Sequence, residues 1–159
     1  MLKWLWLSAL VIVLDQASKR LVDASMQLYE TIELLPLFQL TYVRNPGASF
    51  SFLAGAGGWQ RWLFVGIAST ASVAMVFWLK HLPKERHWEA AAWALVLGGA
   101  LGNLIDRIAY GYVIDFLDAF YQHWHFPAFN VADSAITVGV AILLIDALLV
   151  ARQTEQARK

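Results

Sequence analysis

The sequence predicts an all-α membrane protein with four transmembrane helices and a small β element outside the helix bundle. Hydrophobic residues make up 59% of the 159-residue chain and charged residues 15%, whereas an average soluble domain is ~45–50% apolar and ~25% charged. The chain also holds eight Trp and nine Phe residues, and aromatic rings concentrate at membrane interfaces. The third observation is a set of four apolar stretches, each suited to a membrane-spanning helix.

The longest uncharged stretch runs from Trp62 to Leu79 and measures roughly 27 Å as an α-helix, close to the hydrocarbon thickness of a bilayer. An N-terminal secretory signal peptide is an alternative for the first stretch. However, no A-x-A cleavage site follows that stretch and charges resume at Asp15, which favours a retained signal anchor. We therefore expect one domain, 1–159, with spans at 4–22, 60–80, 89–107 and 131–151 and outer segments at 23–59 and 108–130.

The distribution of basic residues predicts that both termini are cytoplasmic, because Lys and Arg are more frequent on that side. Three of the outer basic residues have a carboxylate nearby, at Asp15, Asp23 or Asp106, which weakens their contribution. With this topology the inner basic residues are Lys3, Lys80, Lys84, Arg86, Arg152, Arg158 and Lys159, and the outer ones are Lys19, Arg20, Arg44, Arg61 and Arg107.

The first outer segment shows the alternation of a β-strand. Residues 38–44 alternate apolar and polar side chains, 45–48 read Asn-Pro-Gly-Ala, and 49–52 alternate again. This pattern predicts a β-hairpin. Its apolar face would hold Phe38, Leu40, Tyr42, Phe50 and Phe52. The second outer segment, 108–130, is rich in Phe, Tyr and Trp, which predicts that it lies along the membrane surface.

Ionisable residues within membrane spans are costly and need a specific reason. By residue count, most of the polar groups in or near the spans fall in the outer half of the membrane or at its edge. Asp146 is the exception, near the inner face, where we expect it beside Arg152. The outer group consists of Asp15, Lys19, Asn103, Asp106, Arg107, Asp115, Asn130 and Asp133.

Structural interpretations of this outer group remain open. Asp15 and Lys19 are i,i+4 neighbours that would form an ion pair at a helix end. Asn130 would cap the last helix, with Asp133 in its first turn. Asp115 lies between Ile114 and Phe116 and has no capping role, so a function is favoured there.

Several chemistries lack support in the sequence. The absence of Cys excludes disulfides, thiol nucleophiles and Cys-ligated zinc, and 12 basic against 12 acidic residues leave no basic field for nucleic acid. No Gly-x-Ser-x-Gly, His-Glu-x-x-His or Gly-rich phosphate loop occurs, and His123-x-His125 is a weak metal pair. Asp115 and Asp133 remain. Two close carboxyls share a proton, which suggests peptide hydrolysis without a metal or a covalent intermediate.

Five ordered blocks, spanning nearly the whole chain, resemble the bacterial lipoprotein signal peptidases, also called signal peptidase II. Any one block alone would be a weak signal, but the five together at these spacings are highly specific. The blocks are Asp15-Gln16-x-x-Lys19, Asn45-x-Gly47-Ala48, Gly98-Gly-Ala-Leu-Gly-Asn103-Leu-Ile-Asp-Arg107, Val113-Ile-Asp115-Phe116 and Phe129-Asn-Val-Ala-Asp133-Ser.

The resemblance implies a cofactor-free and metal-free aspartyl endopeptidase of the bacterial inner membrane, a monomer that contacts membrane lipids. Such enzymes release the signal peptide of prolipoproteins by cleaving just before a diacylglyceryl-cysteine. The resemblance also implies an active site facing the periplasm, a periplasmic β-cradle from the hairpin, and an interfacial helix within 108–130. Asp115 and Asp133 take the catalytic places, and the supporting places fall to Asp15, Lys19, Asn45, Gly47, Asn103, Asp106, Arg107, Asn130 and Ala132.

Three other functions are weaker. A proton-relaying transporter using Asp15, Asp106 and Asp133 predicts midplane ionisable groups and repeat symmetry, and neither is evident. A rhomboid-type protease using Ser49 lacks the expected glycine setting and a placed His. A non-catalytic scaffold would tolerate Asp→Asn at both proposed catalytic positions.

Overall fold

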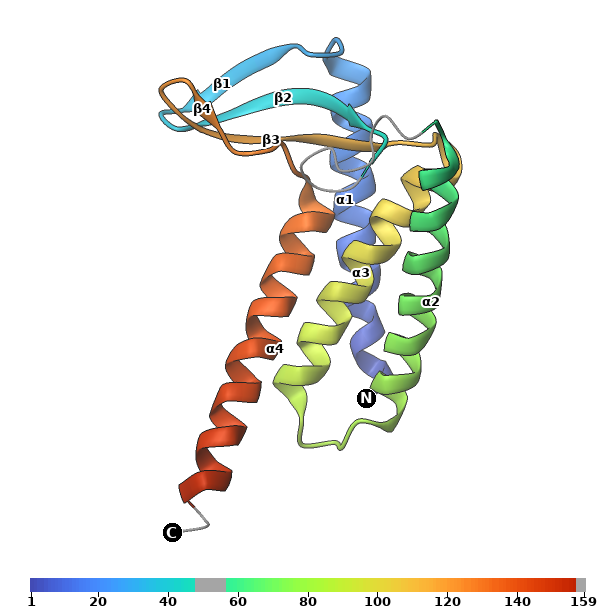
Figure 1. Ribbon diagram of the computed structural model, residues 1–159, viewed down its shortest axis with the longest axis vertical. Helices are drawn as coiled ribbons and strands as arrows, with labels where there is room; N and C mark the ends of the chain where they lie inside the picture. Colours follow the sequence, from blue (N-terminus) through green and yellow to red (C-terminus); the bar gives the residue numbers. More distant parts are fainter. Residues whose placement is uncertain (48–56, 157–159) are drawn as a thin grey trace.

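The computed structural model, which describes residues 1–47 and 57–156, is a helix bundle with a β-sheet across one end (Figure 1). We call this end the sheet end, and the opposite end, where α2 connects to α3, the loop end. The N-terminus and the last described turn of the C-terminal helix lie at the loop end (Figure 1). The long helices of the described chain are α1 (Leu5–Ser25), α2 (Trp59–His81), α3 (His87–Ala109) and α4 (Val131–Gln156), and a 3₁₀ turn, η1 (Leu2–Trp4), precedes α1.

These helices cover the four ranges expected to span the membrane. Within the described chain, three segments are long and apolar enough to cross a bilayer: Trp59–His81, His87–Ala109 and Val131–Arg152. The remaining helix, α1, has 21 residues, but charged side chains interrupt its second half. Two of these, Asp15 and Lys19, are 0% and 1% exposed and so face the bundle interior. A membrane crossing by α1 stays a prediction.

Helix α3 packs against all three other long helices, and glycines allow the close approach. A Cβ on Gly99 would lie 2.3 Å from the Ala132 carbonyl oxygen of α4, and one on Gly98 would lie 2.8 Å from Val11 Cβ of α1. Small residues at helix–helix contacts are typical of membrane bundles. Gly102 makes room for Asp15, whose Oδ2 would lie 2.6 Å from an added Cβ.

The sheet runs antiparallel in the order β1-β2-β3-β4. Its strands in the described chain are β1 (Thr31–Leu35), β2 (Phe38–Asn45), β3 (Val113–Tyr121) and β4 (Trp124–His125). The strand expected over 38–44 is confirmed as β2, which pairs with β1 and β3. The second expected strand, 49–52, lies outside the described residues.

The prediction of an interfacial helix within 108–130 is wrong, because this segment forms β3 and β4. Helix α3 ends where Gly111 adopts a left-handed φ of 84° and donates its N–H to the Arg107 carbonyl at 3.1 Å, a glycine helix stop. The following strand takes its hydrogen bonds from β2, far earlier in the chain. Aromatic content indicated an interface there, but it does not distinguish a helix from a strand.

A small apolar core fixes the sheet to the bundle. Tyr42 of β2 and Ile114 and Phe116 of β3 pack against Val22 and Met26 at the end of α1. The strand that carries Asp115 is therefore held by side chains on both sides of that residue.

The loop end holds Asp146, and its predicted neighbour was wrong. Asp146 Oδ2 lies 2.5 Å from Arg86 Nη2, and Arg86 Nε lies 2.9 Å from Glu89 Oε2. Arg152 follows Asp146 by six positions on α4, about 240° further round the helix. Arg86 reaches Asp146 because it directly precedes α3, which packs along α4.

Candidate active site

Asp115 and Asp133 reach one cavity from two different elements, β3 and the first turn of α4. The cavity has a volume of about 430 Å³. Asp115 is 3% exposed, and Asp133 is half-buried. The lining residues are Asn45, Asn103, Arg107, Val113, Asp115, Phe126, Pro127, Ala128, Phe129, Asp133, Ser134, Thr137 and Val138.

Asn130 contacts both acids. Its Oδ1 accepts the Asp133 N–H at 2.9 Å, and Asp133 Oδ2 accepts the Asn130 N–H at 3.3 Å, which is the reciprocal pattern of a capping box. Asn130 Nδ2 also donates to Asp115 Oδ1 at 2.7 Å. The capping interpretation is thus confirmed, and the same cap places Asp133 in the cavity next to Asp115.

The environment of Asp115 favours its protonated form. Burial raises the pKa of Asp115 to about 7, and the nearby charge of Asp133 acts in the same direction. Hydrogen bonds from Asn45 and Asn130, together with the charge of Lys19, act in the opposite direction. Asp115 therefore holds its proton to a higher pH than an ordinary Asp carboxyl does.

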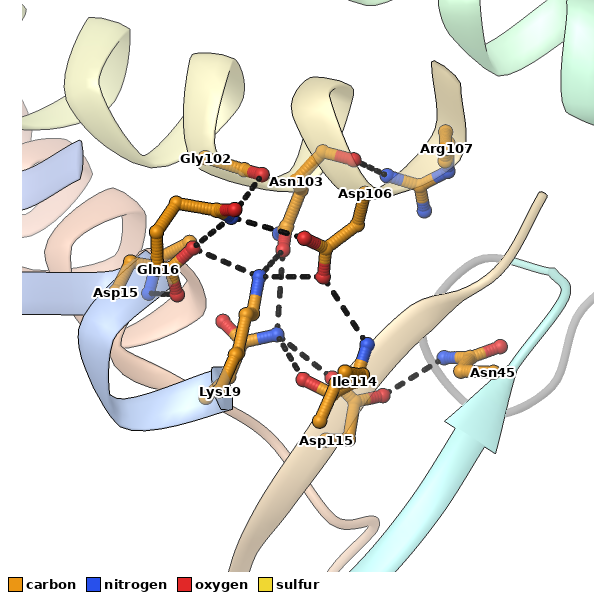
Figure 2. Close-up of polar contacts among 12 residues, drawn as sticks. Asp15, Gln16, Lys19, Asn45, Gly102, Asn103, Asp106, Arg107, Ile114 and Asp115 are labelled. Carbon is orange, nitrogen blue, oxygen red and sulfur yellow. Dashed lines mark hydrogen bonds and ion pairs between the residues drawn. The ribbon is translucent and has the colours of Figure 1, made fainter. Parts of the chain in front are cut away.

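Behind the cavity lies a buried ion cluster, which we call the Lys19 cluster: Asp15, Lys19 and Asp106 (Figure 2). Lys19 Nζ lies 2.8 Å from Asp15 Oδ2 and 3.0 Å from Asp106 Oδ2, and all three side chains are at most 1% exposed. The i,i+4 pair considered above does form, but it belongs to a network between α1 and α3 and does not simply close a helix end. Gln16 joins it, donating to Asp106 Oδ1 at 2.8 Å.

The Lys19 cluster holds the elements that carry the two acids. Asp15 Oδ1 accepts the Ala132 N–H in the first turn of α4 at 2.9 Å. Asp106 Oδ2 accepts the Ile114 N–H, directly before Asp115, at 3.2 Å. Both acids thus sit next to a backbone group anchored by this cluster.

Asn103 connects the Lys19 cluster to the cavity. Its Oδ1 accepts a hydrogen bond from Lys19 Nζ at 2.9 Å, and its Nδ2 donates to Asp133 Oδ1 at 2.8 Å. A continuous path therefore runs from the buried ammonium group to the carboxyl group in the cavity.

Arg107 fastens the segment after β2 to α3. Its Nη2 donates to the Gly47 carbonyl at 3.0 Å, and its guanidinium lies over the Phe64 ring. Gly47 in turn donates its N–H to Asn45 Oδ1 at 3.0 Å, which orients the Asn45 amide toward Asp115 at 3.1 Å (Figure 2).

All the residues predicted for the site lie in this single hydrogen-bonded network. The sequence reasoning did not single out the apolar wall 126–129 or two residues of α4, Thr137 and Val138. Helical spacing would have identified Thr137, since it follows Asp133 by four positions. Gln16 belongs to one of the family motifs but was not predicted to be part of the site.

Neither His123 nor His125 lines the cavity. His125 Nδ1 lies 3.0 Å from Asp118 Oδ2, and Asp118 also accepts a hydrogen bond from Gln39 at 2.6 Å. Across the described residues, no group of three or more His, Asp or Glu side chains is arranged for a metal ion. The site therefore offers carboxyl chemistry: a carboxyl that titrates near neutral pH beside a second carboxyl fits general acid–base catalysis.

This chain is similar in sequence to the members of one protein family. A family model described as Signal peptidase (SPase) II matches residues 7–149. The chain is 59% identical over 146 residues to a lipoprotein signal peptidase of Pseudoalteromonas translucida, covering 92% of this chain and 88% of that protein. It is 51% identical over 155 residues to a lipoprotein signal peptidase of Shewanella halifaxensis, covering 98% and 91%.

Two solved structures share the fold. Both are bacterial membrane enzymes determined by the in meso method, at 2.3 Å and 1.9 Å resolution, and each is 30% identical to this chain. The TM-scores are 0.84 and 0.81; the matches cover 93% of this chain and 88% and 94% of the two solved chains.

Proposed function

Because the chain belongs to the signal peptidase II family of membrane aspartic peptidases, we propose that Asp115 and Asp133 are its catalytic pair. The proposed reaction is removal of the signal peptide from diacylglyceryl-cysteine prolipoproteins. One observation carries this assignment: both carboxyls line one cavity and are bridged by Asn130. Family membership supports the reaction, and the geometry supports the residues.

In this mechanism the two acids differ in charge. The ionised Asp133 takes a proton from water, and the water oxygen attacks the scissile carbonyl carbon. Asp115 keeps its proton, because its pKa is raised to about 7, and donates a hydrogen bond to the carbonyl oxygen. The C–N bond then breaks as Asp115 protonates the leaving cysteine nitrogen, and the signal peptide leaves with a new carboxyl group. Proton transfer from Asp133 to Asp115 restores the starting state.

The cavity suggests how a lipid-bearing substrate enters. Its wall includes Thr137, Val138 and Phe126, and Val138 and Phe126 are 51% and 41% exposed. We propose that the substrate arrives sideways from the bilayer, along this face of α4, with its acyl chains left in lipid. The scissile bond then lies at the sheet end of the bundle, near the membrane surface.

The same proposal orients the protein in the inner membrane, with the sheet end in the periplasm and both termini in the cytoplasm. Five basic residues support it. Lys3, Lys80 and Arg152 lie in η1, near the end of α2 and late in α4, which reach the loop end, and Lys84 and Arg86 lie in the connection between α2 and α3 (Figure 1). An excess of Lys and Arg is typical of the cytoplasmic side.

The test is cleavage of a diacylglyceryl-cysteine precursor by purified protein. We expect Asp115→Asn and Asp133→Asn each to lower kcat by about 10³-fold or more, because each removes a group that moves a proton. Asp118→Asn is the matched control: it lies on the same strand and is 5% exposed, but it does not line the cavity. It should retain kcat within about threefold, and EDTA should not change the wild-type rate. Wild-type turnover by a folded Asp115→Asn or Asp133→Asn variant would exclude the assignment.

A further inference from the structure

Three asparagine side chains surround the proposed catalytic pair, and each points its amide nitrogen at an acid. Asn130 and Asn45 donate to the two oxygens of Asp115, at 2.7 Å and 3.1 Å. Asn103 donates to Asp133 Oδ1 at 2.8 Å. An amide has a donor nitrogen and an acceptor oxygen. These contacts therefore require all three side chains to face the acids with the nitrogen and not with the oxygen.

Each amide oxygen is held by a group that donates. The Asn130 oxygen accepts the Asp133 backbone N–H at 2.9 Å, and the Asn45 oxygen accepts the Gly47 backbone N–H at 3.0 Å. The main chain therefore fixes these two amides.

The third amide, Asn103, has no such backbone donor at its oxygen among the hydrogen bonds described. Its Oδ1 faces Lys19 Nζ at 2.9 Å and the amide of Asn130 at 3.2 Å. An ammonium group has three donors and no acceptor, so a reversed Asn103 would set its own N–H groups against those of Lys19. The orientation of Asn103 thus depends on a side chain of another helix.

Lys19 is placed to orient the Asn103 amide, and it is not placed to take a direct part in the reaction. Its side chain is 1% exposed, and its three donors meet Asp15, Asp106 and Asn103. It does not line the cavity. Burying these charges costs free energy, and the mechanism above gives them no proton to transfer.

We propose that Lys19 is a positioning residue of the peptidase, which fixes the Asn103 amide with its nitrogen toward Asp133. This inference rests on the proposed function, since it concerns the acid that accepts the proton from water. With Asn103 held this way, the ionised Asp133 receives a hydrogen bond. With Asn103 reversed, the ionised carboxylate would face an acceptor oxygen, and its ionised form would be disfavoured.

Charge alone must be separated from this orientation effect. The charged groups around Asp133 are Asp115 from β3, Arg107 from α3 and, behind Asn103, the Lys19 cluster of Asp15, Lys19 and Asp106. Replacing Lys19 alone would remove a positive charge as well as a donor. The double variant Lys19→Gln/Asp106→Asn removes one charge of each sign and leaves the cluster's net charge unchanged. Gln both donates and accepts, so it no longer dictates the orientation of Asn103.

The experiment measures kcat and KM of this double variant across pH with the diacylglyceryl-cysteine precursor. We expect kcat to fall about 10–100-fold with KM within about threefold, as for loss of a transition-state interaction. The acid limb of the pH profile should move to higher pH by about one unit, because the ionised base has lost its donor. Asp106→Asn keeps a side-chain oxygen that can accept the Ile114 N–H. Added to Asn103→Leu, the double change should therefore slow the reaction no further, since Lys19 acts through that amide.

Two comparisons complete the test. Arg86→Gln/Asp146→Asn likewise removes one charge of each sign, in the ion pair at the loop end, and should leave kcat and the acid limb unchanged. Lys19→Arg keeps a donor-only group and should bring the acid limb back toward the wild-type position, and it decides the matter if the double variant does not fold.

The outcomes separate this inference from the proposed function. A wild-type kcat and acid limb in the folded double variant, with Asp133→Asn inactive, would overturn the role of Lys19 and leave the catalytic pair intact. An acid limb that moves as far in Lys19→Arg as in the double variant would overturn that role too. Turnover by Asp133→Asn would overturn both the role of Lys19 and the catalytic pair.

Discussion

The bundle has an ion cluster at each end, and the two clusters differ in their burial and in the groups to which they are hydrogen-bonded. At the sheet end, Lys19 is 1% exposed and joins two carboxylates that are also buried. At the loop end, Arg86 is 36% exposed and its partner Asp146 is 25% exposed. Both clusters join separate helices with short charged contacts, so contact distance alone does not distinguish them.

The two clusters differ in the groups that lie next to them. The loop-end cluster extends to Glu89, which accepts hydrogen bonds from the Trp78 and Trp93 indoles at 3.2 Å and 3.4 Å; its contacts join α2, α3 and α4 and end there. The Lys19 cluster extends through Asn103 to a carboxyl that lines a cavity. A buried ion cluster is weak evidence for stability, and its connection to reactive groups is the better indication of function.

The largest effect should come from two glycines that bring α3 and α4 together, Gly99 beside the first turn of α4 and Gly139 further along that helix. A Cβ at Gly99 would meet the Ala132 carbonyl oxygen at 2.3 Å, and one at Gly139 would meet the Ala92 carbonyl oxygen at 2.7 Å. Both Gly99→Ala and Gly139→Ala should lower the melting temperature, since each forces α3 and α4 apart. Gly99→Ala should also lower kcat, by about 10–100-fold, because it displaces the turn that carries Asp133. Gly139 follows the cavity-lining Val138 but lies six positions beyond Asp133, so Gly139→Ala should lower kcat less.

Measuring kcat and thermal unfolding on the same preparations checks this contrast. Gly66→Ala serves as the neutral control, since an added Cβ there meets nothing within 4 Å. Equal loss of kcat in Gly99→Ala and Gly139→Ala would contradict the idea that the catalytic geometry depends chiefly on the first turn of α4.

The pH dependence of activity should depend only on groups at the sheet end. The pKa of Asp115 is raised to about 7 by burial, so its protonated form predominates below about that pH and is lost as the pH rises above it. Activity that needs this proton should fall as pH rises through about 7, by about tenfold per unit at the limit. Asn45→Ala removes a hydrogen bond that lowers the pKa of Asp115, and should move this basic limb to higher pH.

The pH-rate profiles of wild type, Asn45→Ala and Arg86→Gln provide the measurement. Arg86→Gln lies at the loop end and should leave the basic limb in place. A shift to lower pH in Asn45→Ala would mean that the limb reports a group other than Asp115.

The sequence predicted the helices and the grouping of the candidate site residues, because both depend on local patterns or on conspicuous residues. Long apolar runs fix helix position within a few residues, and a carboxyl such as Asp115 between apolar neighbours is conspicuous wherever it lies. Asp15, Asn103 and Asp133 were placed together by counting depth along helices, and the hydrogen bonds join them. Recognition of the family motifs added Asn45, which spacing alone did not connect to Asp115.

The predictions that failed concerned residues whose structure depends on contacts with residues distant in the sequence. Strand β3 owes its conformation to pairing with β2, as in Val43 opposite Asp115, and the composition of 108–130 carries no trace of that register. Asp146 was placed beside Arg152 from sequence proximity, whereas α3 packing brings Arg86. Which atom of an amide faces which neighbour is likewise a tertiary property, so the role of Lys19 was not visible from its i,i+4 relation to Asp15.

The smallest effect should come from the loop end itself. Arg86→Gln/Asp146→Asn replaces a partly exposed ion pair with neutral side chains of similar size, and such pairs contribute about 0–1 kcal/mol to stability. We expect the free energy of unfolding to fall by no more than about 1 kcal/mol, and kcat to stay at the wild-type value. Thermal unfolding with and without added salt checks this, because screening should weaken an exposed pair in the wild type and leave the variant unaffected. A larger, salt-independent loss would show that this cluster holds α4 as firmly as the buried cluster holds its first turn, and the contrast between the two ends would then rest on the cavity alone.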